Sequence, residues 1–173
     1  MKSFTTRVAS PSDEAGVSAL LETSYSVLMA RDYTPELLTL ALPLICKANP
    51  ALLRSGTYWV AENLQGEMVG CGGWTAQRPG SGDTLGGIGG IGGIGHIRHF
   101  ATHPAWTRRG IGRVLMDACK DDARKKDVSR FECYSSLSAR SFYAALDFQA
   151  CGSIDIALGN SCLFPSVRME CPL

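Results

Sequence analysis

The stretch HFATHPAWTRRGIGRVLM, from His99 to Met116, is the most informative part of the sequence. A strand-like pattern ends at His103-Pro104, a short loop follows, and Gly110-Ile111-Gly112 opens a segment with helical periodicity. The first turn of a helix has unpaired backbone N–H groups and a partial positive charge. Glycines there remove the Cβ atoms that would keep an anion away. The stretch therefore predicts a binding site for a diphosphate, with positive charge added by Arg108, Arg109 and Arg113.

Outside this stretch the chain alternates between strand and helix patterns without a linker long enough to separate domains. Helices are expected after the capping box of Ser10 and Asp13, after Thr34-Pro35, from Gly112 to about Lys126, and around Ala139 to Leu146. Pro43 should leave the second helix short or bent. Strands are expected at Ser3–Ala9, Thr57–Asn63, Met68–Thr75, His96–Thr102, Arg130–Ser135, Gln149–Leu158 and Leu163–Cys171.

Composition indicates one globular α/β domain over residues 1–173, because 45% of the residues are apolar and 19% are charged. The net charge is only +1, so the surface has no general attraction for nucleic acid. Seven cysteines without a C-x-x-C pair favour reduced core thiols over a disulfide framework. No signal peptide or membrane span is visible, and a cytoplasmic protein is the expectation.

A Gly-rich stretch from Pro79 to Gly95 matches the pattern G-x-G-x-x-G at Gly87–Gly92 and again at Gly90–Gly95. A dinucleotide site would need a strand before the pattern and a helix after it. A Pro/Gly/Ser segment precedes this pattern and a strand follows it, so a flexible loop between two strands is expected instead. The three histidines lack the spacing of a zinc site, and no metal is expected.

The segment from Thr107 to Gly112 resembles the signature Q/R-x-x-G-x-G/A of the GNAT acetyltransferase superfamily. Thr107 stands where Gln or Arg is usual, and Arg108 or Arg109 is a candidate to compensate. The later segment SLSARSFYAALDF, Ser136 to Phe148, resembles the family helix A-x-x-F-Y-x-x-L-G-F, with Asp147 in place of Gly. A helix and a strand separate the two segments, as in that family.

The resemblance implies a single-domain GNAT fold: a mixed, mostly antiparallel sheet with a central splayed pair of parallel strands, flanked by about four helices. It implies an N-acetyltransferase that uses acetyl-CoA as the acyl donor and a primary amine as the acceptor, and it leaves room for a homodimer. The residues implied in binding the cofactor are Phe100, Ala101, Thr102, Arg108, Arg109, Gly110, Ile111, Gly112, Arg113, Ser136 and Tyr143.

Catalytic roles follow from the same resemblance. Tyr143 aligns with the tyrosine that protonates the departing thiolate in many members. His96 lies where many relatives carry a glutamate base, although some relatives need no base. The acceptor could be a small molecule, a peptide N-terminus or a lysine, with Tyr25, Tyr33 and Trp74 near it by position in the fold. The alternative function is a non-catalytic acyl-CoA-binding module.

Overall fold

The computed structural model describes residues 3–76, 93–160 and 162–173. Seven strands form one sheet in the order β1-β2-β3-β4-β5-β7-β6, and β4 and β5 run parallel while the other neighbours are antiparallel. This architecture confirms the expected fold class. The strands are β1 (Phe4–Val8), β2 (Tyr58–Asn63), β3 (Met68–Thr75), β4 (Gly93–Thr102), β5 (Val128–Ser136), β6 (Gln149–Leu158) and β7 (Cys162–Pro172).

Five α-helices are present among the described residues, compared with the expected four: α1 (Glu14–Leu28), α2 (Pro35–Ile45), α3 (Pro50–Leu53), α4 (Ile111–Lys125) and α5 (Arg140–Ala144). The additional helix, α3, is a single turn that begins where the side chain of Asn49 accepts hydrogen bonds from Ala51 N and Leu52 N. The expected capping box is also present, with Ser10 N donating to Asp13 Oδ2 at 2.7 Å. Pro43 lies inside α2, which continues to Ile45.

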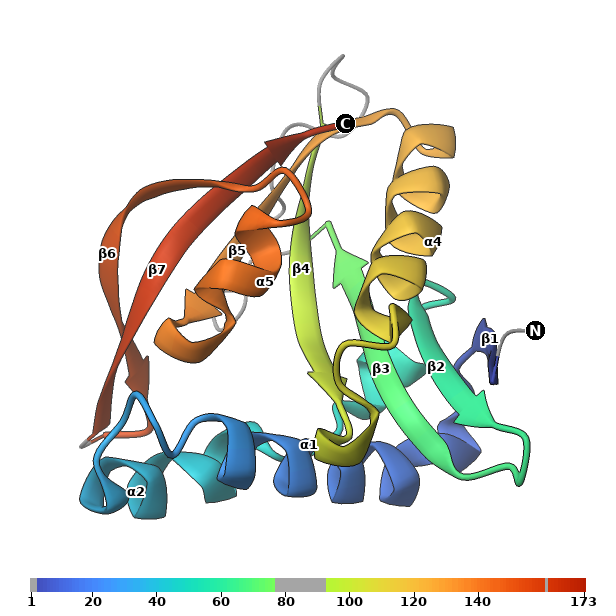
Figure 1. Cartoon of the computed structure of the whole chain (residues 1–173). Helices are drawn as coiled ribbons and strands as arrows, with labels where there is room; N and C mark the ends of the chain where they lie inside the picture. Colours follow the sequence, from blue (N-terminus) through green and yellow to red (C-terminus); the bar gives the residue numbers. More distant parts are fainter. Residues whose placement is uncertain (1–2, 77–92, 161) are drawn as a thin grey trace.

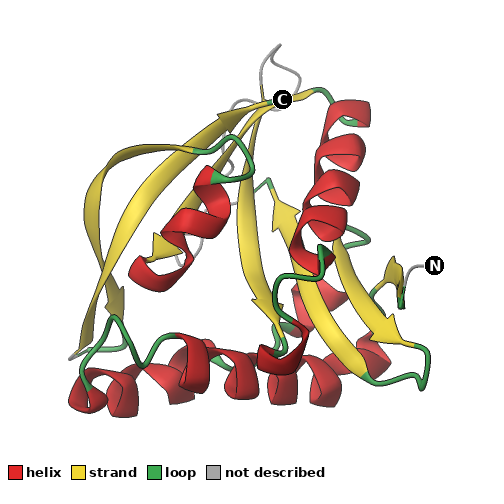
Figure 2. Cartoon of the chain, viewed as in Figure 1, coloured by secondary structure: helices red, strands yellow, loops and turns green. Residues whose placement is uncertain are grey.

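The sheet has an apolar core on each of its faces. Helices α4 and α5 lie on the face seen in Figures 1 and 2. Ile111 and Leu115 of α4 pack there against Ala61 and Val69. Helix α1 packs on the opposite face, where its apolar side contacts a core that includes Val60, Cys71 and Ala101. Between them, α1 and α4 sandwich the central strands, which fixes the ends of β4 relative to both helices.

The Gly-rich stretch expected at Pro79–Gly95 lies partly outside the described residues, which resume at Gly93. Its last residues, Gly93 to Gly95, begin β4. The second G-x-G-x-x-G pattern therefore runs into a strand, whereas a dinucleotide site needs a helix there. Gly95 is required by packing, because a Cβ at this position would lie 2.7 Å from the ring of Phe131 and 2.9 Å from Trp74. Within the described residues, none of the helices has the length and apolar character needed to cross a membrane.

Candidate active site

The site begins where the parallel strands β4 and β5 separate. Their pairing runs from Gly93 opposite Val128 to His96 opposite Glu132. Beyond His96 the two strands diverge, while β5 stays paired with β7 (Figure 1). The result is a V-shaped opening in the sheet, which exposes the edge of β4 from Phe100 to Thr102.

A β-bulge in β4 shapes one arm of this opening. Arg98 lies opposite Gly73 and Ala101 lies opposite Cys71, so two residues of β4 face the single residue Gly72 of β3. His99, inside the bulge, has a φ of 45°. A Cβ at Gly72 would lie 2.6 Å from the Phe100 ring, so glycine is needed beside the bulge.

Two tyrosines hold the bulge from the α1 side. The hydroxyl of Tyr58 donates to the carbonyl of His99 at 2.8 Å, and the hydroxyl of Tyr25 donates to the carbonyl of Phe100 at 3.1 Å. Buried polar groups are costly unless paired, so these two bonds favour the bulged conformation. The bulge also shifts the alternation of side chains along β4. Ile97 packs beneath α4 and α5, whereas Ala101, four residues later, packs on the opposite face with α1.

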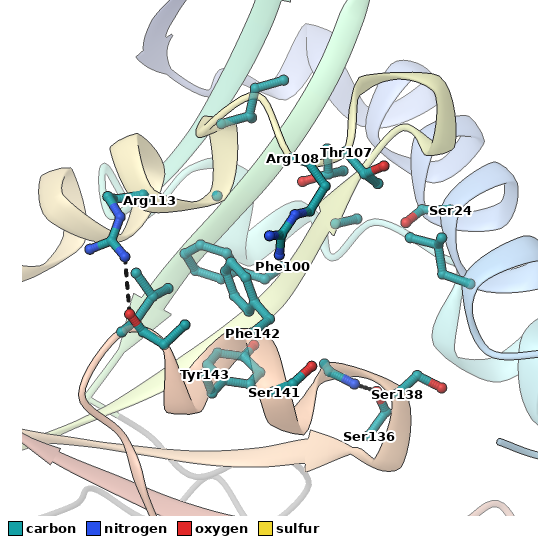
Figure 3. Close-up of a pocket in the computed structure, with 18 of the residues that line it drawn as sticks. Ser24, Phe100, Thr107, Arg108, Arg113, Ser136, Ser138, Ser141, Phe142 and Tyr143 are labelled. Carbon is teal, nitrogen blue, oxygen red and sulfur yellow. Dashed lines mark hydrogen bonds between the residues drawn. The ribbon is translucent and has the colours of Figure 1, made fainter. Parts of the chain in front are cut away.

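A pocket of about 630 Å³ fills the opening (Figure 3). It is bounded by the exposed edge of β4, the first turn of α4, the segment from Ser136 into α5, and the end of α1. In Figure 3 the loop with Arg108 borders the pocket on one side, and α5 with Tyr143 borders it on the other. Of the residues expected to bind a cofactor, those that line this pocket are Phe100, Ala101, Thr102, Arg108, Gly110, Ile111, Gly112, Arg113, Ser136 and Tyr143.

The loop before α4 has the conformation that its glycines allow. Gly110 is the N-cap of α4 with a φ of 81°, and Arg108 has a φ of 64°. These left-handed residues turn the chain so that the first turn of α4 borders the pocket. A Cβ at Gly112 would lie 2.4 Å from the ring of Phe142, so this glycine also lets α5 pack closely against α4. The hydroxyl of Thr107 donates to the carbonyl of Pro104 at 3.1 Å and closes the loop.

The three arginines of the loop have different surroundings. Arg108 borders the pocket directly. Arg113 also borders it, but its Nη2 donates to the carbonyl of Ala145 at 3.0 Å, which ties α4 to the end of α5. Arg109 lies outside the pocket lining and stacks over the ring of Trp106 at 4.5 Å. Its expected role in binding a cofactor therefore has no support from its position.

Tyr143 lies on α5 at the inner wall of the pocket and is almost fully buried. Its ring packs edge-on against Phe142 and Phe148, with centroid distances of 5.0 and 5.3 Å. Burial raises the pKa of the Tyr143 phenol well above its ordinary value, so the hydroxyl stays protonated. This side chain is consequently a protonated phenol in an apolar setting.

His96 sits at the vertex of the V, as the last residue of β4 that pairs with β5. It is fully buried, and its Nδ1 lies 3.1 Å from the carbonyl of Glu132. Its ring meets Tyr134 edge-on with a centroid distance of 4.7 Å. His96 is not part of the pocket lining. A base at this position would therefore act on the amine from outside the pocket, behind the point where β4 and β5 separate.

The sequence matches the family model described as "Acetyltransferase (GNAT) domain" over residues 53–169, which is more than half of the chain. The chain belongs to the GNAT acetyltransferase family. A comparison with curated protein sequences gave no match.

Solved structures agree with this GNAT assignment at the level of the fold. A GCN5-related N-acetyltransferase from Rhodopseudomonas palustris superposes with a TM-score of 0.76 and 22% identity, covering 100% of this chain and 98% of the other. The PaiA N-acetyltransferase from Thermoplasma acidophilum, in complex with coenzyme A, gives 0.70 and 16% over 99% of both chains. Rv2747 from Mycobacterium tuberculosis, in complex with CoA and NLQ, gives 0.62 and 20%, covering 98% of this chain and 99% of the other.

The structure adds pocket residues of this GNAT domain that the sequence did not identify. The end of α1 contributes Ser24, Leu28 and Met29, and the α5 side contributes Ser138 and Ser141. The helical periodicity of α1 indicates a buried side but not the opening that it borders. Of the aromatic residues expected near the acceptor, Tyr25 lines the pocket. Tyr33 lies in the core between α2 and β7, where it stacks on Phe164 at 4.4 Å.

Proposed function

We propose that this GNAT domain transfers an acetyl group from acetyl-CoA to a primary amine by direct attack in a ternary complex. The observation that carries the proposal is the pocket itself, which joins the first turn of α4, the splayed edge of β4 and Tyr143 in one continuous space. Two GNAT structures with the same fold are complexes with coenzyme A, which supports this donor.

The residues present fit the donor in chemistry and in position. Gly110, Ile111 and Gly112 bring the backbone amides of the α4 first turn to the pocket, where a diphosphate would be stabilised by them and by Arg108. The splayed edge of β4 offers backbone groups of Phe100 to Thr102 to an extended amide-bearing arm. A backbone N–H near Phe100 or Ala101 could also stabilise the oxyanion that forms at the thioester carbonyl.

The reaction needs two proton movements. The amine nitrogen forms a bond to the thioester carbonyl carbon, the C–S bond breaks, and the thiolate takes a proton. Tyr143 is our candidate for that proton donor, because burial keeps its phenol protonated at the pocket wall. His96 is our candidate for accepting the proton of the amine, through water, from its place at the vertex.

The decisive experiment measures binding and turnover separately. Isothermal titration calorimetry with acetyl-CoA tests the donor, and release of free thiol across a panel of primary amines tests the transfer. Binding together with amine-dependent thiol release supports the proposal. Binding without thiol release for any amine would favour the alternative, a non-catalytic acyl-CoA-binding module. Absence of binding would overturn both.

A further inference from the structure

A second cavity, of about 400 Å³, lies on the other side of β4 from Ile97 and has no role in the function proposed so far. It is formed where the end of β3 meets α3 and the start of β2. Apolar walls come from Ala51, Leu52, Trp74 and Ala76, and the cationic group that borders it is Arg98 of β4.

The charge of Arg98 is poorly compensated within the described part of the chain. Its Nη1 contacts the hydroxyl of Thr75 at 3.4 Å, and no carboxylate of the described residues pairs with it. Burial lowers the pKa of the Arg98 guanidinium, which reflects a charge held partly away from water. Burying a cation is unfavourable unless an anion compensates it, so the cavity is suited to an anionic guest.

The hydroxyl groups of the cavity are already hydrogen-bonded. The hydroxyl of Thr57 donates to the carbonyl of Trp74 at 2.6 Å, and the hydroxyl of Ser55 contacts the carbonyl of Leu52 at the same distance. The guanidinium of Arg98 is therefore the charged group that the cavity offers to a ligand. Its planar pair of N–H donors matches a carboxylate, which it can bind through two parallel hydrogen bonds.

The cavity is close to the proposed reaction centre along β4. Arg98 precedes Phe100 by two residues, which places their backbones at most about 7 Å apart along the chain, and Phe100 lines the donor pocket. Thr75, which borders the cavity, pairs in register with His96 at the vertex. A ligand with an amine and a carboxylate separated by a few methylene groups would thus span the two places.

We propose that this second cavity binds a carboxylate of the amine acceptor, with the guanidinium of Arg98 as its anchor. The inference rests on the proposed acetyl transfer and narrows the acceptor to amines that carry a carboxylate. The acceptor amine then reaches the V-shaped opening while its carboxylate stays at Arg98. The apolar walls of the cavity favour an acceptor with methylene groups next to the carboxylate.

The test compares matched acceptors that differ only in the carboxylate. Glycine, β-alanine, γ-aminobutyrate and aminohexanoate are each paired with the alkylamine that lacks the acid group, and thiol release is measured for every compound. We expect the longer amino acids to exceed their matched amines by roughly tenfold or more in kcat/KM, mainly through a lower KM. A wild-type enzyme that prefers the alkylamines would overturn the inference.

Substitution then assigns the preference to Arg98. Arg98→Met keeps a long apolar side chain and removes a partly desolvated charge, so the fold should survive. The variant should lose the preference for carboxylates while its affinity for acetyl-CoA by calorimetry stays unchanged. Arg54→Met, at an exposed position just before the cavity residue Ser55, is the matched control and should keep the preference. An unchanged preference for carboxylate-bearing acceptors in Arg98→Met would contradict the proposal.

A direct binding measurement keeps this inference separate from the proposed function. If no amine supports thiol release, the proposed acetyl transfer is wrong. The cavity is then tested by titrating aminohexanoate into the wild type and into Arg98→Met. Heat of binding in the wild type that is lost in Arg98→Met would support a carboxylate site without the transfer reaction. Absence of heat in the wild type would overturn the site as well.

Discussion

Tyr143 combines two properties that usually conflict, since it is almost fully buried among aromatic rings and yet borders a pocket. Its neighbours Phe142 and Phe148 hold the phenol ring edge-on, which fixes the direction of the hydroxyl. Because burial disfavours the phenolate and raises the pKa of Tyr143, the hydroxyl is protonated near neutral pH. These properties make its role testable by removing a single oxygen atom.

Tyr143→Phe should lower thiol release by roughly a hundredfold or more, within the range of a single positioned acid. The ring remains, so its packing against Phe142 and the affinity for acetyl-CoA should stay close to wild type. Steady-state thiol release and calorimetry on the same preparation measure the two quantities. Unchanged turnover would remove Tyr143 from the mechanism, and a lost affinity would indicate a structural role instead.

Gly112 offers a second test at the scale of one residue. Replacing it with Ala places a Cβ 2.4 Å from the ring of Phe142, so this ring or the helices α4 and α5 must shift. We expect Gly112→Ala to lower the free energy of unfolding by about 1–3 kcal/mol, as is typical of overpacking. Urea denaturation measures the change.

Gly16→Ala in α1 is the matched control for this substitution. Its Cβ would lie 3.1 Å from the flexible Cε of Met68, which can move aside. Alanine is also the better helix former by up to about 1 kcal/mol, so this variant should be as stable as the wild type or more stable. Equal stability of the two variants would contradict the packing role of Gly112.

At the scale of elements, the sequence predicted the order of strands and helices, and the caps at Ser10 and Thr34 are confirmed. These features depend on neighbours within a few residues, such as Asp13 three positions after Ser10. The bulge in β4 was not predicted, because it depends on Gly72 making room for Phe100 across the sheet and on Tyr25 and Tyr58 from distant elements. The position of Arg109 over Trp106 was missed for the same reason.

The residues of the site likewise divide into those that the sequence identified and those that depend on distant elements. The glycines were identified from their place at the start of a helix and Tyr143 from the family resemblance, and all of them line the pocket. The cavity around Arg98 is formed by α3, the start of β2, the end of β3 and one residue of β4. Arg98 comes beside the other lining residues only through the pairing of β4 with β3, so the folded sheet is needed to reveal the cavity.

The junction of β1 with the start of α1 provides a prediction at the scale of elements. Arg7 on β1 donates to both oxygens of Asp13 at 2.8 Å, and its Nη2 also lies 2.6 Å from Glu62 of β2. Arg7 lowers the pKa of Asp13 from 3.8 to about 2. A carboxyl with a lowered folded pKa stabilises the fold above its ordinary pKa, and this stabilisation is lost as the pH falls from about 4 to about 2.

Arg7→Met should therefore lower the stability near neutral pH by up to about 2 kcal/mol and flatten the loss of stability between pH 4 and pH 2. Urea denaturation over this pH range measures both effects. Arg31→Met is the control, because Arg31 is mostly exposed and lies 3.5 Å from Asp32, a surface pair that contributes little. An identical pH profile for wild type and Arg7→Met would contradict the assignment.

At the scale of the whole molecule, the packing of both sheet faces can be read from the seven cysteines. All seven are free thiols, and only Cys151 on the edge strand β6 is exposed. Burial raises the pKa of Cys46 to about 11 and that of Cys71 to about 12, so these thiols are neither accessible nor ionised near neutral pH. The reactivity of the cysteines therefore tests whether the apolar cores on the two faces of the sheet are closed.

An aromatic disulfide reagent at pH 8 should modify one thiol per native chain quickly and all seven after unfolding in guanidinium. Cys151→Ser should abolish the fast reaction without changing the midpoint of urea denaturation, because this side chain lies at the surface. Several fast-reacting thiols in that variant would mean that the two cores are not closed as described. The variant is also useful in the transfer assay, because the exposed thiol of Cys151 would react with the reagent that detects coenzyme A. Amine-dependent thiol release is therefore best measured in Cys151→Ser.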